Sequence, residues 1–198
     1  MFYWFLQRFL RIFFRVLFKA DIRGLEKVPA DGKIILAANH VSNWDPPFLA
    51  CFLERHVHYM AKQELFENKI FSAIIQNLHA FPVKRGESDM NAIKHALGVL
   101  KSDQCLGLFP EGTRSKTGEI QKAESGVSLI AAMSHAPIIP AAIIGTEKIF
   151  SKSEKFPTLH LIFGEPMKFE GKKNDKVALE AFSQNLMNEI AKLKDSSK

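Results

Sequence analysis

A histidine and an aspartate follow the apolar stretch at residues 33–39, which has the composition of a buried strand. His40 and Asp45 are five residues apart, and a tight turn brings such a pair together. The pKa of histidine lies near neutrality, and a carboxylate on one ring nitrogen leaves the other nitrogen ready to accept a proton. The pair therefore fits a general base. Asp45 before Pro46 equally fits an ordinary helix start, so spacing alone leaves both interpretations open.

Four cations stand where other strand-like stretches end. Arginine offers a planar fork of donors that suits phosphate oxygens, and lysine adds a compact positive charge. Because the carboxyl ends of parallel strands meet at one edge of a sheet, we expect these cations along one rim with the histidine. Together they indicate a base acting on a phosphorylated substrate, with a solvated surface turn as the alternative for the arginine. The four cations are Lys62, Lys84, Arg85 and Arg114.

Strand-like and helix-like stretches alternate through the chain after residue 20. This alternation predicts a single α/β domain, residues 21–198, with a largely parallel central sheet flanked by helices. The strand-like stretches are residues 33–39, 57–61, 80–83, 105–109, 138–145 and 159–163. The helix-like stretches are residues 46–54, 63–77, 89–100, 125–134 and 175–194.

Residues 1–20 read as a separate unit, a basic amphipathic helix. Its four cations fall within an arc of about 80° on the helix, and apolar side chains fill most of the opposite side. The longest uncharged run has seven residues, far below the roughly 20 needed to span a bilayer. We therefore expect an interfacial helix in the plane of the lipid headgroups, with packing into the protein core as the alternative. The residues expected at the lipid are Arg8, Arg11, Arg15, Lys19, Phe5, Phe9 and Phe13.

The net charge of +6 is confined to the two ends of the chain, because residues 21–191 hold 20 basic and 20 acidic side chains. The folded body therefore gives no indication of a nucleic-acid partner. The two cysteines, Cys51 and Cys105, both lie in apolar runs without the spacing of metal ligands. We expect buried free thiols, a reducing compartment and no metal site.

Four short blocks resemble, in order, the motif blocks of the glycerolipid acyltransferases. They are NHVSNWDP at residues 39–46, FPVKRG at 81–86, FPEGTRS at 109–115 and IIPAAI at 138–143. The branch that they resemble most is that of the bacterial 1-acyl-sn-glycerol-3-phosphate acyltransferases. The resemblance extends over residues 24–163, and an N-terminal interfacial helix fits a family that works on membrane lipids.

The resemblance implies transfer of a fatty acyl chain from acyl-CoA or acyl-carrier protein to the sn-2 hydroxyl of 1-acyl-sn-glycerol 3-phosphate, which gives phosphatidic acid. It implies that His40 takes the hydroxyl proton while Asp45 holds the imidazole. A thioester is already activated, so the reaction needs no cofactor beyond the acyl donor; Ser42 is a weaker alternative as a covalent nucleophile. The residues implied at the substrate are Lys62, Lys84, Arg85, Glu111, Gly112, Thr113 and Arg114 for the acceptor phosphate and its loop, and Pro140 for the acyl donor.

Three alternatives stay open. The acceptor could be glycerol 3-phosphate or another lysophospholipid. The chain could be a non-catalytic peripheral protein that binds anionic lipid through residues 1–20, or a thioester hydrolase that uses the same histidine on water. The acyltransferase interpretation implies a monotopic or peripheral protein at the cytoplasmic face of the cell membrane, with an anionic phospholipid surface, a lysophospholipid and, as one of two donors, acyl-carrier protein as partners.

Overall fold

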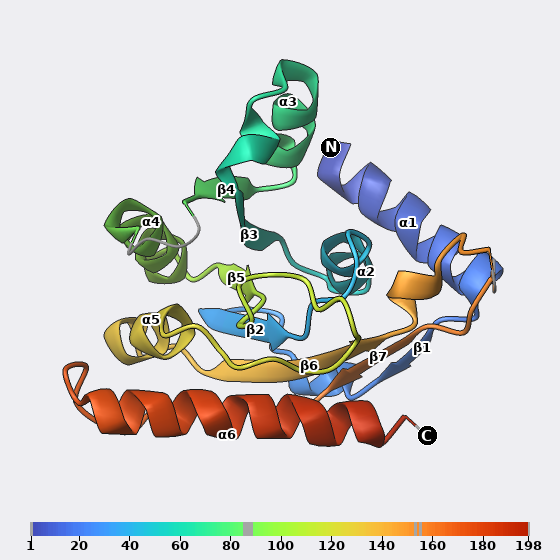
Figure 1. Cartoon of the computed structure of the whole chain (residues 1–198). Helices are drawn as coiled ribbons and strands as arrows, with labels where there is room; N and C mark the ends of the chain where they lie inside the picture. Colours follow the sequence, from blue (N-terminus) through green and yellow to red (C-terminus); the bar gives the residue numbers. More distant parts are fainter. Residues whose placement is uncertain (1, 85–88, 153, 155, 198) are drawn as a thin grey trace.

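The computed structural model describes residues 2–84, 89–152, 154 and 156–197, and within this part of the chain seven strands form one sheet (Figure 1). The strands are β1 (Asp21–Arg23), β2 (Ile34–Ala38), β3 (Val57–Lys62), β4 (Ala80–Val83), β5 (Cys105–Leu108), β6 (Ile138–Ile144) and β7 (His160–Phe163). The α-helices are α1 (Phe2–Phe18), α2 (Asp45–Cys51), α3 (Lys69–Asn77), α4 (Met90–Lys101), α5 (Gly126–Ser134) and α6 (Lys176–Asp195). Three short 3-10 helices are η1 (Leu25–Lys27), η2 (Gln63–Phe66) and η3 (Thr146–Lys148).

The sheet has the order β1-β7-β6-β2-β5-β3-β4, and five neighbouring strands in it, from β6 to β4, are parallel. Only the junction of β6 with β7 is antiparallel among the pairs of described strands. The expectation of a largely parallel α/β sheet is therefore confirmed. As a consequence, the carboxyl ends of β6, β2, β5, β3 and β4 open onto one edge of the sheet, where functional side chains of such folds collect.

Helices cover both faces of the sheet. In Figure 1, α1 and α2 lie on one side, and α4, α5 and α6 lie on the other. Each side has its own apolar cluster, because side chains along a strand alternate between the two faces. Ile34, Leu36 and Ala38 of β2 point into the first cluster, whereas Ile35 and Ala37 point into the second.

Helix α1 packs into the core of the domain. Phe14 and Phe18 are fully buried in the first apolar cluster. Arg11 Nε donates a hydrogen bond to the carbonyl of Cys51 at 2.7 Å, and Arg11 Nη2 donates to the carbonyl of Leu53 at 3.3 Å. Carbonyls at the C-terminal end of a helix such as α2 lack partners within the helix, and a cation is favourable there. The expectation that Arg11 faces the lipid is therefore wrong, because its guanidinium binds backbone carbonyls at the C-terminal end of α2.

A second face of α1 is exposed and apolar. The cations Arg8, Arg15 and Lys19 are exposed beside it. Phe13, also expected at the lipid, is half-buried against the first apolar cluster. Packing into the core therefore describes one face of this helix, and the interfacial placement of its exposed face stays a prediction. No helix in the described ranges combines the length and the low charge that crossing a bilayer requires. The exposed apolar residues of α1 include Phe2, Phe5, Phe9, Ile12, Val16 and Leu17.

The expected helix at residues 63–77 is divided into η2 and α3. Asn68 stands between them, and its side-chain oxygen accepts hydrogen bonds from the backbone N–H groups of Ile70 and Phe71 at 3.1 and 3.0 Å. Asparagine at this position satisfies the first N–H groups of a new helix, so α3 begins directly after it. The division leaves η2 as a direct continuation of β3 and makes α3 a separate helix after Asn68.

Gly107 in β5 leaves room for an aromatic ring from the neighbouring strand. A Cβ at this position would lie 2.7 Å from Tyr59 Cδ1 and 2.8 Å from Val57 Cγ1, both on β3. We expect Gly107→Ala to lower the free energy of unfolding by about 1–3 kcal/mol, because the buried ring has to move. Urea denaturation measures this change.

Gly98→Ala is the matched control for that substitution. Gly98 lies in α4, and a Cβ there would meet nothing within 4 Å. Replacing a helical glycine of this kind raises the free energy of unfolding by about 0.5–1 kcal/mol. Equal effects of the two alanines would contradict the steric role of Gly107.

Candidate active site

The carboxyl end of β2 carries a closely paired histidine and aspartate. His40 Nδ1 lies 2.7 Å from Asp45 Oδ2. This contact favours the tautomer with the proton on Nδ1, and Nε2 is then the nitrogen that can accept a proton. Asp45 is also the first residue of α2 and precedes Pro46. The interpretation of Asp45 as the residue that caps the helix is therefore wrong, because Trp44 is the N-cap of α2 and no side chain caps it. The Asp45 carboxylate instead binds the imidazole.

The Asp45 carboxylate is fully buried and is surrounded by donors. Its Oδ2 accepts the backbone N–H groups of Val41 and Ser42 at 2.7 and 2.8 Å, and its Oδ1 accepts the hydroxyl of Thr146. The Ser42 hydroxyl in turn accepts the backbone N–H of Trp44 at 3.2 Å. The turn from residue 40 to 45 is thus folded around one carboxylate, and the hydroxyl of Ser42 takes part in holding that turn.

The loop after β5 is tied to the backbone of His40. The His40 N–H donates to Glu111 Oε1 at 2.9 Å, and the His40 carbonyl accepts the Ser115 N–H at 2.8 Å. Glu111 Oε2 accepts the N–H of Gln121 at 3.3 Å. Glu111 is almost fully buried, and this burial raises its pKa. The Glu111 carboxylate therefore links the loop after β5 to the backbone of His40, and its expected contact with substrate stays a prediction.

An aromatic stack supports the imidazole of His40. The ring of Phe109 lies 4.1 Å from the His40 ring at an angle of 21°, and the Tyr59 ring continues the stack 6.1 Å from Phe109. The Tyr59 hydroxyl donates to the carbonyl of Pro46 at 3.1 Å, within α2. Gly107 gives Tyr59 the space it needs. The orientation of the base is therefore set by its aspartate at one nitrogen and by packing against its face.

The cations expected at the substrate lie along the same edge of the sheet. Arg114 is exposed and directly precedes the residue that binds the His40 carbonyl. Lys62 ends β3 and pairs with Glu64 at 2.8 Å, and Lys84 follows β4. Neighbouring strands are about 4.8 Å apart, so β4 lies roughly 14 Å from β2. Arg114 is thus brought close to His40, Lys84 lies farther along the rim, and Arg85 lies outside the described residues.

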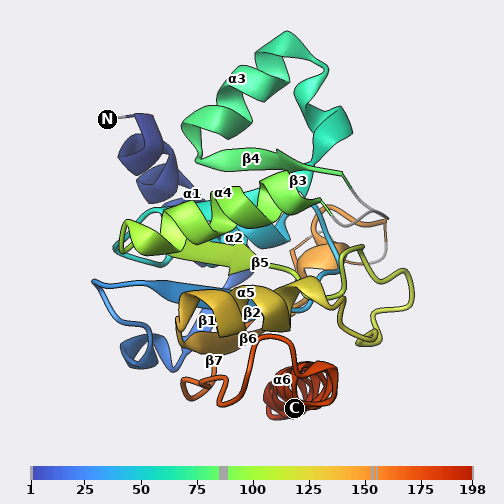
Figure 2. The same cartoon turned by 90° about the vertical axis from the view of Figure 1, so that its left-hand side faces the viewer.

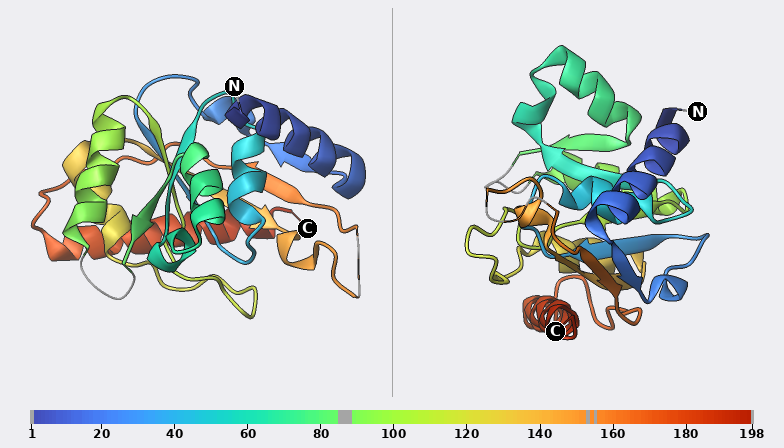
Figure 3. Two further views of the ribbon diagram at one scale, coloured as in Figure 1. Left: turned by 90° about the horizontal axis from the view of Figure 1, so that it is seen from above. Right: turned by 90° about the vertical axis from the view of Figure 1, so that its right-hand side faces the viewer.

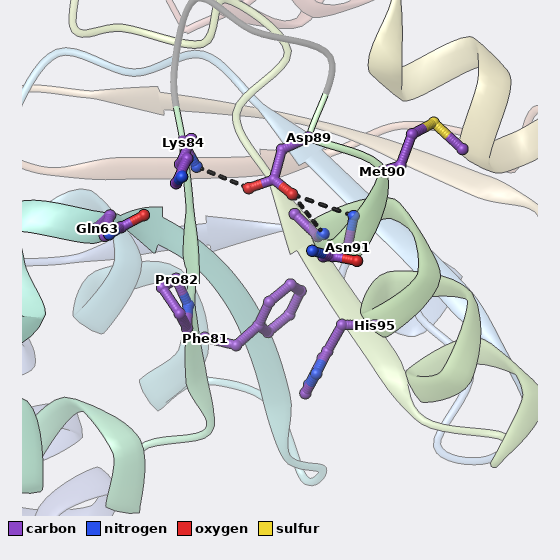
Figure 4. A pocket seen from close by; sticks show the side chains of 9 residues that line it. Gln63, Phe81, Pro82, Lys84, Asp89, Met90, Asn91 and His95 are labelled. Atoms are coloured by element: carbon purple, nitrogen blue, oxygen red, sulfur yellow. Dashed lines mark hydrogen bonds between the residues drawn. The ribbon is translucent and has the colours of Figure 1, made fainter.

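A pocket of about 570 Å³ opens beside Lys84, between the end of β4 and the start of α4 (Figure 4). The Lys84 backbone N–H donates to Asp89 Oδ2 at 2.9 Å, and Asp89 Oδ1 caps α4. Deeper in the pocket the His95 ring stacks on Phe81, with centroids 4.1 Å apart. The rim of cations therefore continues into a concave surface that combines polar and aromatic groups.

The remaining substrate residues implied by the sequence differ in placement. Gly112 has a φ of +67° in the loop after β5, and Thr113 is exposed in the same loop. Pro140 is buried in the middle of β6, opposite Ala37 of β2, which is three residues before His40. The structure therefore brings the loop residues to the rim and leaves Pro140 within the sheet.

Two residues of the site were missed from the sequence. Thr146, which binds Asp45, follows β6 directly after Gly145, so the rule that polar residues mark strand ends would have found it. Asn39 extends β2 with its side chain, since its amide exchanges hydrogen bonds of 2.9 and 2.7 Å with the backbone of Ile143. Across the described ranges, no group of three or more His, Cys, Asp or Glu side chains is arranged to hold a metal ion.

Comparisons with known proteins agree with this geometry. Residues 19–144 match the family model described as "Acyltransferase". The 1-acyl-sn-glycerol-3-phosphate acyltransferase of Bacillus subtilis is 38% identical over 147 residues, which cover 72% of this chain and 70% of that protein. The protein of the same name from Streptococcus pneumoniae is 32% identical over 185 residues, covering 90% of this chain and 67% of that protein.

A solved structure has the same fold. The crystal structure of the 1-acyl-sn-glycerophosphate (LPA) acyltransferase PlsC from Thermotoga maritima matches this chain with a TM-score of 0.78 and 24% identity. The match covers 96% of this chain and 79% of that chain.

Glu111→Gln tests the cost of the buried carboxylate. Because burial raises the pKa of Glu111, the native state holds its proton more tightly than the unfolded state does, and stability falls as the pH rises above about 4.5, the ordinary value for this group. We therefore expect the difference between the free energies of unfolding, Glu111→Gln minus wild type, to increase as the pH rises from about 4.5 to about 7.5.

Urea denaturation at several pH values measures this difference. Glu119→Gln, at an exposed position of the same loop, is the control and should show no such trend. A Glu111→Gln difference that is constant with pH would contradict the assignment.

Proposed function

The chain belongs to the acyltransferase family, and we propose that it transfers a fatty acyl chain from acyl-CoA or acyl-carrier protein to the sn-2 hydroxyl of 1-acyl-sn-glycerol 3-phosphate. The product is phosphatidic acid. The observation that carries this proposal is the 2.7 Å contact between His40 Nδ1 and Asp45 Oδ2, at a sheet edge that also presents exposed Arg114 and Lys62.

The chemistry follows from this pair. His40 Nε2 takes the proton of the acceptor hydroxyl as the hydroxyl oxygen attacks the thioester carbonyl. When the tetrahedral intermediate collapses, the new ester C–O bond is retained, the C–S bond breaks, and the imidazolium returns its proton to the leaving thiolate. Asp45 keeps the ring in the required tautomer and stabilises its positive charge. No covalent acyl-enzyme is needed, because the thioester is already activated.

The acceptor phosphate is assigned to the cations of the rim. Arg114 supplies a planar fork for two phosphate oxygens, and Lys62 and Lys84 add positive charge farther along the edge. Arg85 belongs to the same assigned set. The exposure of Arg114, Lys62 and Lys84 supports the assignment, since a charged ligand has to reach them from solvent or from a lipid surface.

We also assign an anionic phospholipid surface as the partner of α1, which makes the protein monotopic or peripheral at the cytoplasmic face of the cell membrane. The exposed apolar face of α1, flanked by Arg8 and Arg15, supports this assignment. An aromatic bridge runs from this helix to the catalytic turn: the Phe13 ring lies 6.0 Å from Trp44, and Phe150 contacts both rings. A lipid acceptor at α1 is therefore close to the residue that precedes Asp45.

His40→Ala is expected to lower the turnover of lysophosphatidate with acyl-CoA or acyl-carrier protein by about 100- to 10,000-fold, the range of a lost general base. Product formation is followed by mass spectrometry of phosphatidic acid. The matched control is His135→Asn, at an exposed position with a left-handed backbone after α5, which should retain wild-type turnover. Wild-type rates from His40→Ala would rule out this mechanism, and release of CoA that is indifferent to lysophosphatidate would indicate a hydrolase.

Arg114→Ala is expected to lower kcat/KM for lysophosphatidate by roughly 10- to 100-fold, as loss of a charged hydrogen bond to phosphate would. The rate on a monoacylglycerol, which lacks the phosphate, should change little. Lys116→Ala, an exposed cation of the same loop, is the control. An equal loss on both acceptors would contradict the phosphate assignment, and a panel that includes glycerol 3-phosphate and other lysophospholipids identifies the preferred acceptor.

A further inference from the structure

Helix α3 exposes its apolar side and buries a polar residue. Ser72 is its one buried residue, whereas Ile70 is 77% exposed and Phe71 and Ile74 are also exposed. A helix that connects two parallel strands ordinarily buries its apolar stripe on the sheet. Helix α3 connects β3 to β4 but projects beyond β4, as Figure 2 shows. Its apolar side, together with exposed Leu65 of η2, therefore lacks cover from the described parts of the chain.

Helix α3 lies near the N-terminal end of α1. Right-handed crossovers place α2 and α3 on the same side of the sheet, because β2 to β3 and β3 to β4 step in the same direction. The view from above shows α1, α2 and α3 together on that side (Figure 3). A direct contact joins the two regions, since the Tyr3 ring of α1 lies 5.4 Å from the ring of His79, two residues after α3.

We propose that α3 is a second bilayer-contacting element beside α1, so that the enzyme meets the membrane along two helices; this inference rests on the proposed lipid acceptor. Within α3 the single charged residue is Lys69, and the acids of the segment, Glu64 and Glu67, precede α3, so the apolar side of α3 and its position beside α1 carry the proposal. Lys62 directly precedes η2 and is assigned to the acceptor phosphate. Contact of the segment from η2 to α3 with the bilayer sets Lys62 at the depth of the lipid headgroups.

The first test places a fluorescent label on α3. Ile74→Cys is labelled with bimane, and the native thiols do not compete because Cys51 and Cys105 are buried. Vesicles of phosphatidylcholine and phosphatidylglycerol carry doxyl quenchers on their acyl chains. Val177→Cys, at an exposed position of α6 on the other side of the sheet, is the control. We expect quenching at position 74 to exceed that at position 177 by roughly twofold or more, and equal quenching would overturn the proposal.

The second test removes apolar surface without adding charge. The double variant Ile70→Ser/Ile74→Ser should bind the same vesicles without quencher more than about tenfold more weakly than the wild type, whereas Val177→Ser should bind like the wild type. Circular dichroism and the thermal midpoint confirm that each variant is folded. Unchanged partitioning of the folded double variant would overturn the proposal. A dimer that forms without lipid in sedimentation experiments, and that the double variant abolishes, would also overturn the proposal, because α3 would then be covered by a second copy. A complex with acyl-carrier protein that depends on α3 would overturn it in the same way.

Neither test depends on the reaction, because the vesicles hold no acyl donor or lysolipid. His40→Ala should bind vesicles like the wild type and show the same quenching at position 74. A failure of the proposed function appears as turnover that does not need His40, while a failure of this inference appears as an α3 that does not reach the acyl chains of an otherwise active enzyme.

Discussion

The buried carboxylate of Asp45 determines the geometry of the turn at the carboxyl end of β2. A carboxylate without partners inside a protein costs several kcal/mol, so its surroundings have to supply donors. The turn after β2 supplies two backbone N–H groups and an imidazole, and the segment after β6 supplies the Thr146 hydroxyl. Two parts of the chain are thereby held at one point, and the position of the His40 ring is a result of satisfying that charge.

Local signals in the sequence were sufficient for the parts of the site that are local in the fold. His40 and Asp45 meet within one turn, and the cations follow strands whose parallel order brings their ends to one edge. Contacts between distant segments could not be predicted in this way. Thr146 is 101 residues from Asp45, and Arg11 is 40 residues from the carbonyl that it binds. Glu111 illustrates the same difficulty, since its motif places it in the loop after β5, and only the structure shows that it binds the N–H of His40, 71 residues away.

The helices on the two sides of the sheet differ in how they use apolar residues. Helices α4, α5 and α6 each place an apolar stripe in the second cluster, as the patterns of the sequence indicate. Helix α1 has apolar residues on more than one face, because it covers the sheet with Phe14 and Phe18 and still presents other aromatic rings outward. A pattern count cannot assign these residues to one face or the other. The shape of the neighbouring surface, here the end of α2, decides which of them are buried.

The short helix α2 begins with Asp45, and α1 contacts it at both ends, through Trp44 before Asp45 and through the carbonyl of Cys51. Its seven residues span about 10 Å, and a helix of this length behaves as a rigid rod. Arg11 donates a hydrogen bond to the carbonyl of Cys51 at one end of this helix, and Asp45 binds the imidazole of His40 at the other. Helix α1 and the imidazole of His40 are therefore bound at opposite ends of one short helix rather than through a loop.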